Sequence, residues 1–537
     1  MKKKYFLCFL SPLFCFCLGC SILEEDPKTI LTPPGYYDTK IGIETLVNAC
    51  YARLRSNLAS GTNMLRLTEQ GTDIFESGID GSINFDNYNI SLTAGEITNT
   101  WQDYYIGINA CNNVTHYIGT AKGMTDSERK IREAEARFLR AYMYYFLIMQ
   151  FGDVHLTIEA TEGVQTEANR TPVSTILDEV IYPDLNFAVE NLPSTQPDYG
   201  RIDAHGAKFF LSYVLLSDER SAKQQFDQAA QLAVSVIENS NYALQENRFK
   251  MFDQDNENNN EILWSIQFSQ DESLRGSGNQ THLFFIHKYE TNIPGMIRSI
   301  QYGRPYTRFK PTQHMSDLYD ETIDARYQAY WRDEWYVNSP TATLNLGDTA
   351  IYFPKNPWTR EQIDSKNYRV YNPESSESLG TGYLRVTNQY YFQLKKFDDT
   401  KRTSINETSG TRNWVLFRLA EAYLLAGEAY FRGGNLDDAV KYINILRRNC
   451  ALPGKESEME ITASDLSVDF ILDERARELC GEGKRWYDLK RLGKLLERTM
   501  KYNSRASTSM QPYHVLRPIP QSQRDRCSND YPQNEGW

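Results

Sequence analysis

Residues 418–448 read RLAEAYLLAGEAYFRGGNLDDAVKYINILRR and carry the clearest helical-hairpin signal in the chain. Apolar residues recur every three or four positions on each side of Gly433-Gly434-Asn435, which is the spacing of two amphipathic helices joined by a tight turn. Small residues such as Ala426 and Gly427 lie in the first apolar stripe and let the two helices approach closely. This pattern is typical of a tetratricopeptide-like hairpin, a unit that stacks on its neighbours to bury a continuous core.

The same periodicity recurs along much of the chain. Residues 131–149, IREAEARFLRAYMYYFLIM, form an apolar stripe that ends before Gly152-Asp153. Comparable spacing predicts further helices at 41–58, 97–118, 207–216, 226–237, 466–480 and 484–499. We therefore predict a mostly α fold built on a tetratricopeptide-like helical hairpin scaffold.

The composition changes between residues 250 and 411. Asn, Gly, Pro and Tyr become frequent, and the segment holds four of the eight tryptophans of the chain: Trp264, Trp331, Trp335 and Trp358. Long irregular segments on a rigid scaffold often carry function, so we interpret 250–411 as a loop-rich elaboration, with short strands such as 383–392. The predicted regions are 38–249 (N-terminal helical), 250–411 (loop-rich) and 412–537 (C-terminal helical), and we expect 38–537 to form one compact unit.

The N-terminus predicts export and lipid anchoring. Three lysines precede an apolar run that ends at Leu18, a pattern typical of a secretory signal peptide over residues 1–19. Leu18-Gly19-Cys20 resembles a bacterial lipobox, in which the cysteine is acylated. We therefore expect acylated Cys20 to anchor the protein in outer-membrane lipid, and residues 20–37 to act as a tether. The alternative is an ordinary cleaved signal peptide that contains a cysteine by chance.

Composition excludes some function classes. The 537 residues carry a formal net charge of -12, which argues against nucleic acid as a partner because phosphate binding needs a basic surface. The cysteines after the signal lack metal-site spacing; we expect buried free thiols, with a Cys450–Cys480 disulfide as the alternative. The segment that begins at Asp253 departs from a calcium loop, because Asn258 and Trp264 occupy its glycine and glutamate positions. We expect no metal and no cofactor.

The chain shows none of the motifs of nucleophilic or phosphoryl-transfer enzymes. The carboxylates of residues 473–482 could in principle serve a glycoside hydrolase. Asp473 and Arg477 are, however, four residues apart on a predicted helix, so an ion-pair network is the simpler interpretation. We therefore expect a protein that is not an enzyme.

Several segments resemble the SusD/RagB family of outer-membrane nutrient-binding lipoproteins. Besides 418–448, they are AEARFLRAYMYYFLIMQFGDVHL (134–156), ILDERARELCGEGKRWYDLKRLG (471–493), LRPIPQSQ (516–523) and QNEGW (533–537). The resemblance covers nearly the whole mature chain in the same order. It implies a helical scaffold with a loop-rich ligand-binding face, a position on the cell exterior, and a SusC-like TonB-dependent transporter as partner.

The resemblance also implies that the protein captures a glycan, an oligosaccharide or polysaccharide, and delivers it to the transporter without catalysis. Capture of peptides, as a RagB-like lipoprotein, is the main alternative. A secreted helical glycoside hydrolase and a structural adhesin are further alternatives.

Exposed aromatic rings can stack on the faces of a sugar, while carboxylates and amides bond its hydroxyls. The family also places the loop after the first helix, here 68–88, beside the ligand. The candidate ligand-binding residues are Asp73, Phe75, Asp80, Asn84, Tyr302, Tyr306, Trp331, Trp335, Tyr336 and Trp358. For Trp331 and Trp335, core packing is an equally open interpretation, and we expect Trp101 and Trp486 to be core residues.

Overall fold

The computed structural model describes residues 33–58, 60–238, 241–373 and 382–537. The predicted signal peptide, the predicted acylation site Cys20 and most of the predicted tether lie outside these residues. Within the described part of the chain, no helix combines the length and the apolar character needed to cross a bilayer.

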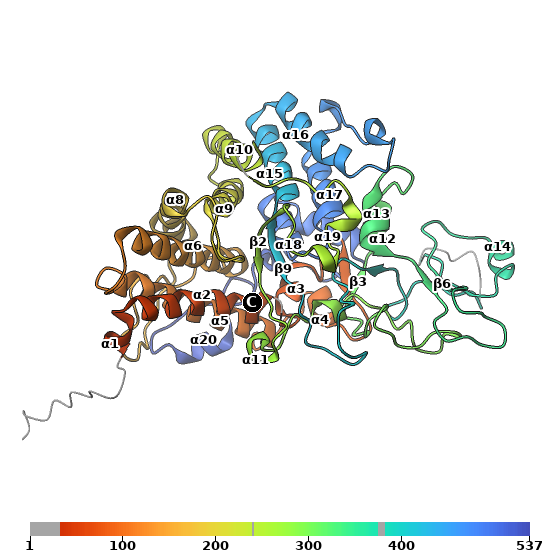
Figure 1. Ribbon diagram of the computed structural model, residues 1–537, viewed down its shortest axis with the longest axis horizontal. Coiled ribbons are helices and arrows are strands. Elements are labelled where there is room, and N and C mark those ends of the chain that lie inside the picture. The colour runs from red at the N-terminus through yellow and green to blue at the C-terminus, as the bar shows by residue number, and fades with distance from the viewer. Residues whose placement is uncertain (1–32, 59, 239–240, 374–381) are drawn as a thin grey trace, which may run out of the picture.

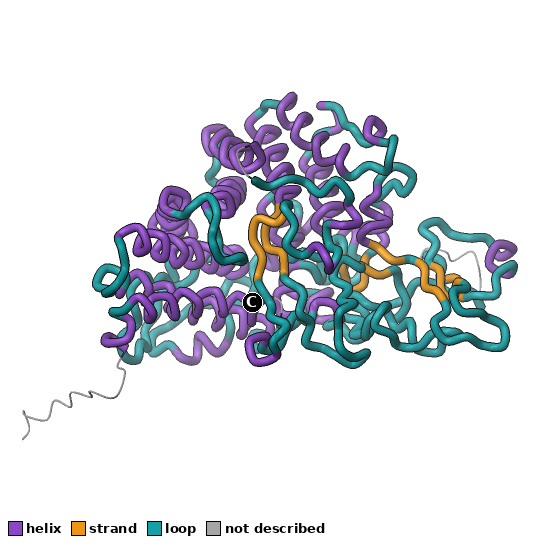
Figure 2. The backbone as a smooth tube through the Cα atoms, in the orientation of Figure 1, coloured by secondary structure: helices purple, strands orange, loops and turns teal. Residues whose placement is uncertain are grey.

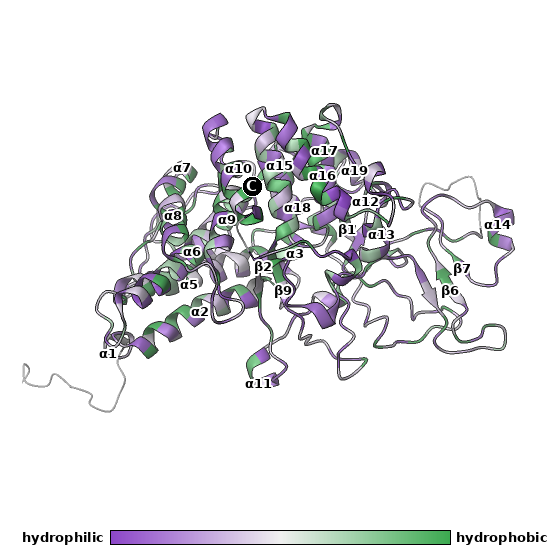
Figure 3. Ribbon diagram, turned by 45° about the horizontal axis from the view of Figure 1, so that its top comes forward, coloured by the Kyte–Doolittle hydropathy of each residue, from purple (hydrophilic) through white to green (hydrophobic). Residues whose placement is uncertain are grey.

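A stack of helices, each packed on the next, occupies the left and top of the molecule (Figure 1). Its members in order of contact are α2 (Lys40–Leu58), α5 (Gly95–Tyr117), α6 (Asp126–Phe151), α8 (Tyr182–Asn191), α9 (Ala204–Ser217), α10 (Lys223–Glu238), α15 (Leu419–Gly433) and α16 (Leu436–Asn449). Helix α10 packs on α15 although the whole 250–411 region lies between them in the sequence. Figure 3 shows that polar and apolar residues alternate along these helices, as burial of one face requires. The mostly α fold is confirmed.

Local signals explain the hairpin of α15 and α16. Gly434 adopts φ +85°, a left-handed conformation that glycine reaches without steric cost, and the Asn435 side chain then accepts the Asp438 N–H to cap α16. Gly427 sets the helix spacing, because a Cβ there would lie 2.5 Å from Cγ1 of Ile443. The two helices therefore approach more closely than any larger residue would permit.

Shorter elements complete the described chain. The remaining α-helices are α1 (Pro33–Tyr37), α3 (Asn63–Thr68), α4 (Ile83–Asp86), α7 (Val173–Ile176), α11 (Glu272–Arg275), α12 (Gln313–Asp317), α13 (Ala325–Tyr330), α14 (Arg360–Asp364), α17 (Val468–Leu479), α18 (Arg485–Arg491), α19 (Leu495–Tyr502) and α20 (Gln521–Arg526). A π-helical turn spans Leu177–Ile181, and 3-10 turns span Arg248–Lys250, Gln254–Asn256, Thr281–Leu283, Glu456–Glu458, Ala463–Asp465 and Pro512–Val515.

The strands are short and form small sheets within the loop-rich part (Figure 2). The antiparallel pairs are β1 (Phe75–Ser77) with β3 (Phe309–Pro311), β2 (Ile262–Ile266) with β9 (Trp414–Arg418), and β4 (Trp331–Arg332) with β8 (Gln393–Leu394). In the remaining sheet, β6 (Thr349–Tyr352) pairs antiparallel with β5 (Glu334–Tyr336) and parallel with β7 (Arg369–Val370). Pairs β1–β3 and β2–β9 both join segments that are distant in the sequence, and so attach the loops to the helical regions.

Three local predictions were wrong. The helix expected at 484–499 is broken into α18 and α19, because Gly493 adopts φ +68° between them. Residues 383–392 do not form the expected strand. Arg385 makes only an isolated β-bridge to Asn372, and strand β8 begins at Gln393. The first helix of the predicted hairpin begins only at Leu419, because Trp414–Arg418, which includes the first residue of the predicted hairpin, pairs with β2 as strand β9.

Helix α17 carries buried carboxylates that bind arginines from distant segments. Glu478 accepts from Arg248 at 3.2 Å and from Arg418 at 2.5 Å, and Glu474 accepts from Arg326 at 2.8 Å. Burial alone would raise the pKa of Glu478, but the surrounding guanidinium groups hold it well below its usual value. These carboxylates are ionised and fully paired inside the protein, which confirms an ion-pair network here. The particular pairing of Asp473 with Arg477 was wrong: Asp473 binds Arg498, and Arg477 binds Glu474.

The described cysteines are free thiols, as expected, although one of them is not buried. Cys50, Cys111, Cys450 and Cys480 are buried free thiols in the described structure, and Cys527 is a partly exposed one. Cys450 lies 3.5 Å from a carboxylate oxygen of Glu478, so it belongs to the surroundings of the ion-pair network and not to a disulfide with Cys480.

A second buried ion pair generates a test of stability. Asp73, in the loop before β1, binds Arg485 at 2.7 Å and Arg498 at 2.9 Å. Burial opposes its ionisation, but the two arginines lower the pKa of Asp73 to about 2. We expect Asp73→Asn to reduce the free energy of unfolding by about 3–5 kcal/mol at pH 7, because it leaves buried arginines uncompensated.

The contribution of Asp73 to the free energy of unfolding should depend on pH. A carboxyl with a lowered folded-state pKa stabilises the protein above its ordinary pKa of 3.8, and this stabilisation is lost as the pH falls through about 2. Denaturant unfolding between pH 7 and pH 2 should therefore show a smaller loss of stability for Asp73→Asn than for the unmodified protein. The exposed Asp437→Asn, which should change stability by less than about 1 kcal/mol, is the matched control. Equal effects of the two substitutions would contradict the assignment.

Candidate ligand-binding face

Four segments of the chain are joined by backbone hydrogen bonds on the loop-rich side of the molecule (Figure 2). The Gly78 N–H donates to the Arg308 carbonyl at 3.0 Å, and the Ile79 N–H donates to the Asn388 carbonyl at 2.8 Å. The Lys288 N–H in turn donates to the Gln389 carbonyl at 3.1 Å. We define the ligand face as nine polar or tyrosine side chains of these segments, all partly or fully exposed: Asp80, Asn84, Lys288, Arg304, Tyr306, Arg308, Asn388, Gln389 and Tyr390.

Backbone strain lies at the centre of the ligand face. Thr307 adopts φ +47°, a conformation that a β-branched residue rarely takes, and its buried hydroxyl has no hydrogen-bond partner. Gly78 crosses it so closely that a Cβ there would lie 2.3 Å from the Thr307 carbonyl oxygen. Strain of this kind costs of order 1–3 kcal/mol and persists only where the surrounding structure imposes it, often at binding sites.

This strained backbone positions the ring of Tyr306. The guanidinium carbons of Arg304 and Arg308 lie 5.3 and 5.8 Å from the centre of the Tyr306 ring. Burial lowers the pKa of Arg308 somewhat, but its guanidinium also donates to the carbonyl of Asp80, whose carboxylate binds Lys288. On the ligand face Asp80 and Lys288 therefore form an ion pair, whereas Arg304 and Arg308 donate to backbone carbonyls and lie close to the half-buried tyrosine ring.

An open cavity of about 740 Å³ adjoins the segment 386–390. Its walls are Tyr371, Tyr383, Leu384, Arg385, Val386, Thr387, Asn388, Gln389 and Tyr390. Tyr390 stacks on Tyr371 with ring centres 4.9 Å apart and donates its hydroxyl hydrogen to the Thr291 carbonyl at 2.9 Å, so its ring is fixed. The volume falls within the range of roughly 300–1,000 Å³ that small-molecule sites occupy.

The chemistry of this surface is that of recognition. Tyrosine rings offer apolar faces, and the amides and guanidinium groups offer hydrogen-bond donors and acceptors around them. Within the residues that the structure describes, no cluster of three or more His, Cys, Asp or Glu side chains is arranged to hold a metal ion.

The sequence-based candidates divide into two groups. Asp80, Asn84 and Tyr306 lie on the ligand face, and Trp358 is partly exposed beside it, where its backbone N–H and C=O bind the side chain of Asn372. Tyr336 is 45% exposed on β5, where its hydroxyl donates to Glu334 at 2.8 Å. These five side chains remain candidates for ligand contact.

The other five candidates are buried, which corrects the expectation that they contact a ligand directly. They are Asp73, Phe75, Tyr302, Trp331 and Trp335. Asp73 belongs to the ion pair described above. The Trp335 ring packs 4.4 Å from His287 and 5.6 Å from Phe353, and the Trp331 ring packs 5.1 Å from Phe392. The loop-rich region has few helices to build a core from, so large aromatic rings fill it. Trp101 and Trp486 are buried as expected.

Sequence reasoning missed part of the ligand face. Lys288, Arg304 and Arg308 belong to no recognisable motif, and the sequence pattern predicts a strand over 383–392. The available signal was its composition, because YLRVTNQY combines two tyrosines with two amides in a stretch without helical periodicity.

Comparisons with known proteins show the family of the chain. A sequence model described as the SusD family matches residues 260–537, and one described as starch-binding and associating with the outer membrane matches residues 31–216. SusD-like protein P25 of Formosa agariphila is 25% identical over 97% of this chain and 96% of its own length. Starch-binding protein SusD of Bacteroides thetaiotaomicron is 27% identical over 78% of this chain and 75% of its own length.

A solved structure shares the fold. Surface glycan-binding protein A from Bacteroides thetaiotaomicron, determined in complex with laminarihexaose, superposes with a TM-score of 0.68 at 20% identity, covering 92% of this chain and 99% of the other. The first of the two family models spans more than half of the 537 residues, and both match in the order expected from the sequence. The chain belongs to the SusD family.

Proposed function

We propose that this protein is a cell-surface glycan-binding lipoprotein, which captures an oligosaccharide or polysaccharide and delivers it, without catalysis, to a TonB-dependent outer-membrane transporter. The observation that carries the proposal is the ligand face with its adjoining cavity, where fixed tyrosine rings stand among amides and guanidinium groups. A sugar ring presents apolar C–H patches to such rings and hydroxyls to the polar groups around them.

The named relatives support a glycan rather than a peptide as the ligand. One relative is called a starch-binding protein, and one structural neighbour was determined with a bound laminarihexaose. The ligand face also disfavours a basic peptide, because Asp80, the one carboxylate among the residues that define it, already binds Lys288.

The arrangement of carboxylates supports a binding protein over a hydrolase. General acid–base catalysis requires two carboxyl groups that face the substrate, with one of them protonated. Glu474 and Glu478 are instead buried and bound to arginines, and their pKa values are lowered. They are therefore neither accessible to a polysaccharide nor able to donate a proton at neutral pH.

Loss of a stacking ring should weaken binding without unfolding the protein. We expect Tyr306→Ala to reduce affinity for the preferred polysaccharide by about tenfold, which corresponds to about 1.4 kcal/mol. Its thermal midpoint should remain nearly unchanged, because the ring is only half-buried. Affinity electrophoresis and calorimetry with a panel of neutral polysaccharides and casein peptides measure this effect.

Trp335→Ala is the contrasting control, because its ring is fully buried. It should lower the free energy of unfolding by about 3–5 kcal/mol, as large core truncations do. Retention of full affinity by Tyr306→Ala would remove the ligand face from the proposal. Binding of peptides and of no polysaccharide would replace the glycan with the alternative ligand.

The proposed anchor is acylated Cys20, followed by a short acidic tether. We expect Cys20→Ser to prevent acylation and to move the protein from the outer-membrane fraction to a soluble fraction, because the acyl chains are the proposed anchor. Metabolic labelling with a fatty-acid analogue followed by membrane fractionation measures both changes. A variant that stays membrane-bound and labelled would exclude Cys20 as the anchor.

The proposed transporter partner can be tested separately. Affinity purification of the protein from outer membranes solubilised in mild detergent should recover a TonB-dependent barrel in roughly equal amount. The Cys20→Ser protein, purified in the same way from the soluble fraction, is the control for non-specific capture. Recovery of the lipoprotein without any barrel would argue against delivery to a transporter.

A further inference from the structure

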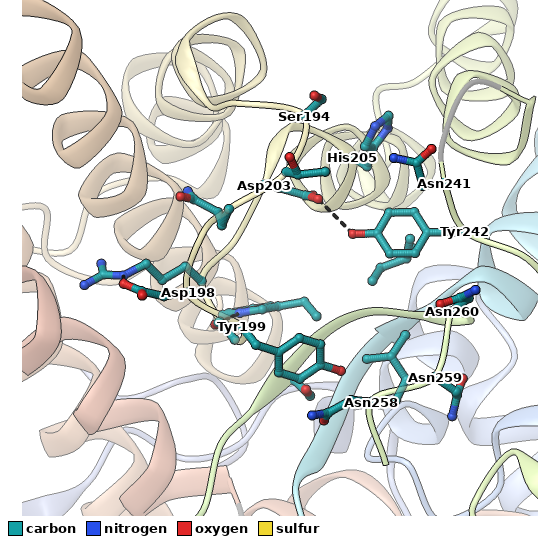
Figure 4. Close-up of a pocket in the computed structure, with 18 residues that line it drawn as sticks. Ser194, Asp198, Tyr199, Asp203, His205, Asn241, Tyr242, Asn258, Asn259 and Asn260 are labelled. Atoms are coloured by element: carbon teal, nitrogen blue, oxygen red, sulfur yellow. Dashed lines mark hydrogen bonds and ion pairs between the residues drawn. The ribbon is translucent and has the colours of Figure 1, made fainter. Parts of the chain in front are cut away.

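A second cavity, of about 240 Å³, lies where the helical region 38–249 meets the start of the loop-rich region (Figure 4). It is bordered by the loop before α9, the first turn of α9, Asn241 with Tyr242, and the start of β2 with the asparagines that precede it. Its lining residues include Asp198, Tyr199, His205, Asn241, Asn258 and Asn260. Among the described residues, it shares no lining residue with the cavity of the ligand face.

The walls of this second cavity are rigid. Asp203 caps α9 by accepting the Gly206 N–H at 2.9 Å and also accepts the Tyr242 hydroxyl at 2.8 Å, the bond drawn in Figure 4. The Trp264 indole N–H donates to the Gly200 carbonyl at 3.0 Å and fixes the loop to β2. Gly200 has φ +93°, and a Cβ there would lie 2.5 Å from Cγ of Gln267, so the loop passes β2 at a distance that only glycine allows.

Two side chains of the cavity are poised for a ligand. Tyr199, next to the fixed Gly200, leaves 48% of its surface exposed although it is a large aromatic residue. His205 is only 8% exposed, and its Nδ1 is buried without a hydrogen-bond partner. The imidazole ring lines the cavity and its Nε2, unlike Nδ1, is not a buried unpartnered atom, so Nε2 is the nitrogen that a ligand hydroxyl can reach. Figure 4 shows the two rings on opposite sides of the open space.

The remaining lining defines the class of ligand. Asp203 has both carboxylate oxygens engaged, and Asp198 pairs with Arg201 at 3.1 Å, so the cavity offers no free charge from these groups to attract an ion. The rim consists mainly of exposed amides and hydroxyls, among them Asn241, Asn258 and Asn260. Burial lowers the pKa of His205, so its imidazole is neutral and can bond a hydroxyl. These groups match the neutral hydroxyls of a sugar.

We propose that this cavity is a second carbohydrate-binding site, which holds one neutral sugar ring against Tyr199 with a hydroxyl bonded to His205. Its size supports a single ring, because about 240 Å³ is below the range of roughly 300–1,000 Å³ that larger ligands require. The site extends the proposed function, since two sites on one lipoprotein would bind separate points of a polymer and increase its retention.

Saturation-transfer NMR on the purified protein with methyl glycosides of glucose, galactose, mannose, xylose and N-acetylglucosamine tests this proposal. At least one of these sugars should show transfer. Tyr199→Ala and His205→Phe should each weaken that sugar's binding by about tenfold in a titration, whereas Tyr306→Ala should leave it unchanged. Tyr182→Ala, a substitution of another partly exposed tyrosine beside a different cavity, is the matched control.

The outcomes separate this site from the ligand face. Transfer that is lost in Tyr199→Ala and retained in Tyr306→Ala supports the second site, even if the ligand face binds no polymer. Absence of transfer for every sugar would overturn it. Loss of binding in Tyr306→Ala with no effect of Tyr199→Ala would also overturn it and would assign the sugar to the ligand face. Thermal unfolding shows whether each variant is folded before its sugar binding is measured.

Discussion

The buried carboxylates of α17 organise the part of the structure that carries the ligand face. Glu478 binds arginines from the segment after α10 and from the end of β9, and Glu474 binds an arginine from α13. These partners stand on both sides of the loop-rich insertion and within it. Loss of one partner leaves an uncompensated charge in the interior, at a cost of about 3–5 kcal/mol. This ion-pair network therefore helps to fix the position of the loop-rich region relative to the helices.

The helical stack supplies the platform for this arrangement. Because α10 packs directly on α15, the stack continues across the insertion as if the intervening chain were absent. The insertion begins and ends at neighbouring points, which strand pair β2–β9 joins. Most of its backbone polar groups cannot use helix hydrogen bonds, and they are satisfied by short sheets and by bonds between loops. A face of this kind presents side chains from many segments on one rigid scaffold.

The ligand face and the second cavity illustrate different ways to expose an aromatic ring. On the ligand face, Tyr306 directly precedes the strained backbone at Thr307 and lies close to two arginines. In the second cavity, a glycine with positive φ holds its neighbour Tyr199 beside a β-strand. In both places an unusual backbone conformation prevents the ring from collapsing into the core, where most of the large rings of the loop-rich region lie.

The sequence alone determined the helical scaffold, because the hairpin at 418–448 and the stripe at 131–149 depend on local periodicity and on turn residues such as Gly434. Its motifs also determined the family. Only the tertiary structure decided which aromatic residues are accessible: Trp335 and Tyr336 are adjacent, yet one is buried and the other exposed. Exposure in an irregular region depends on long-range contacts that no periodicity records. For the same reason the sequence located the loop around Asp80 but missed residues 383–390, which reach it only through hydrogen bonds across the fold.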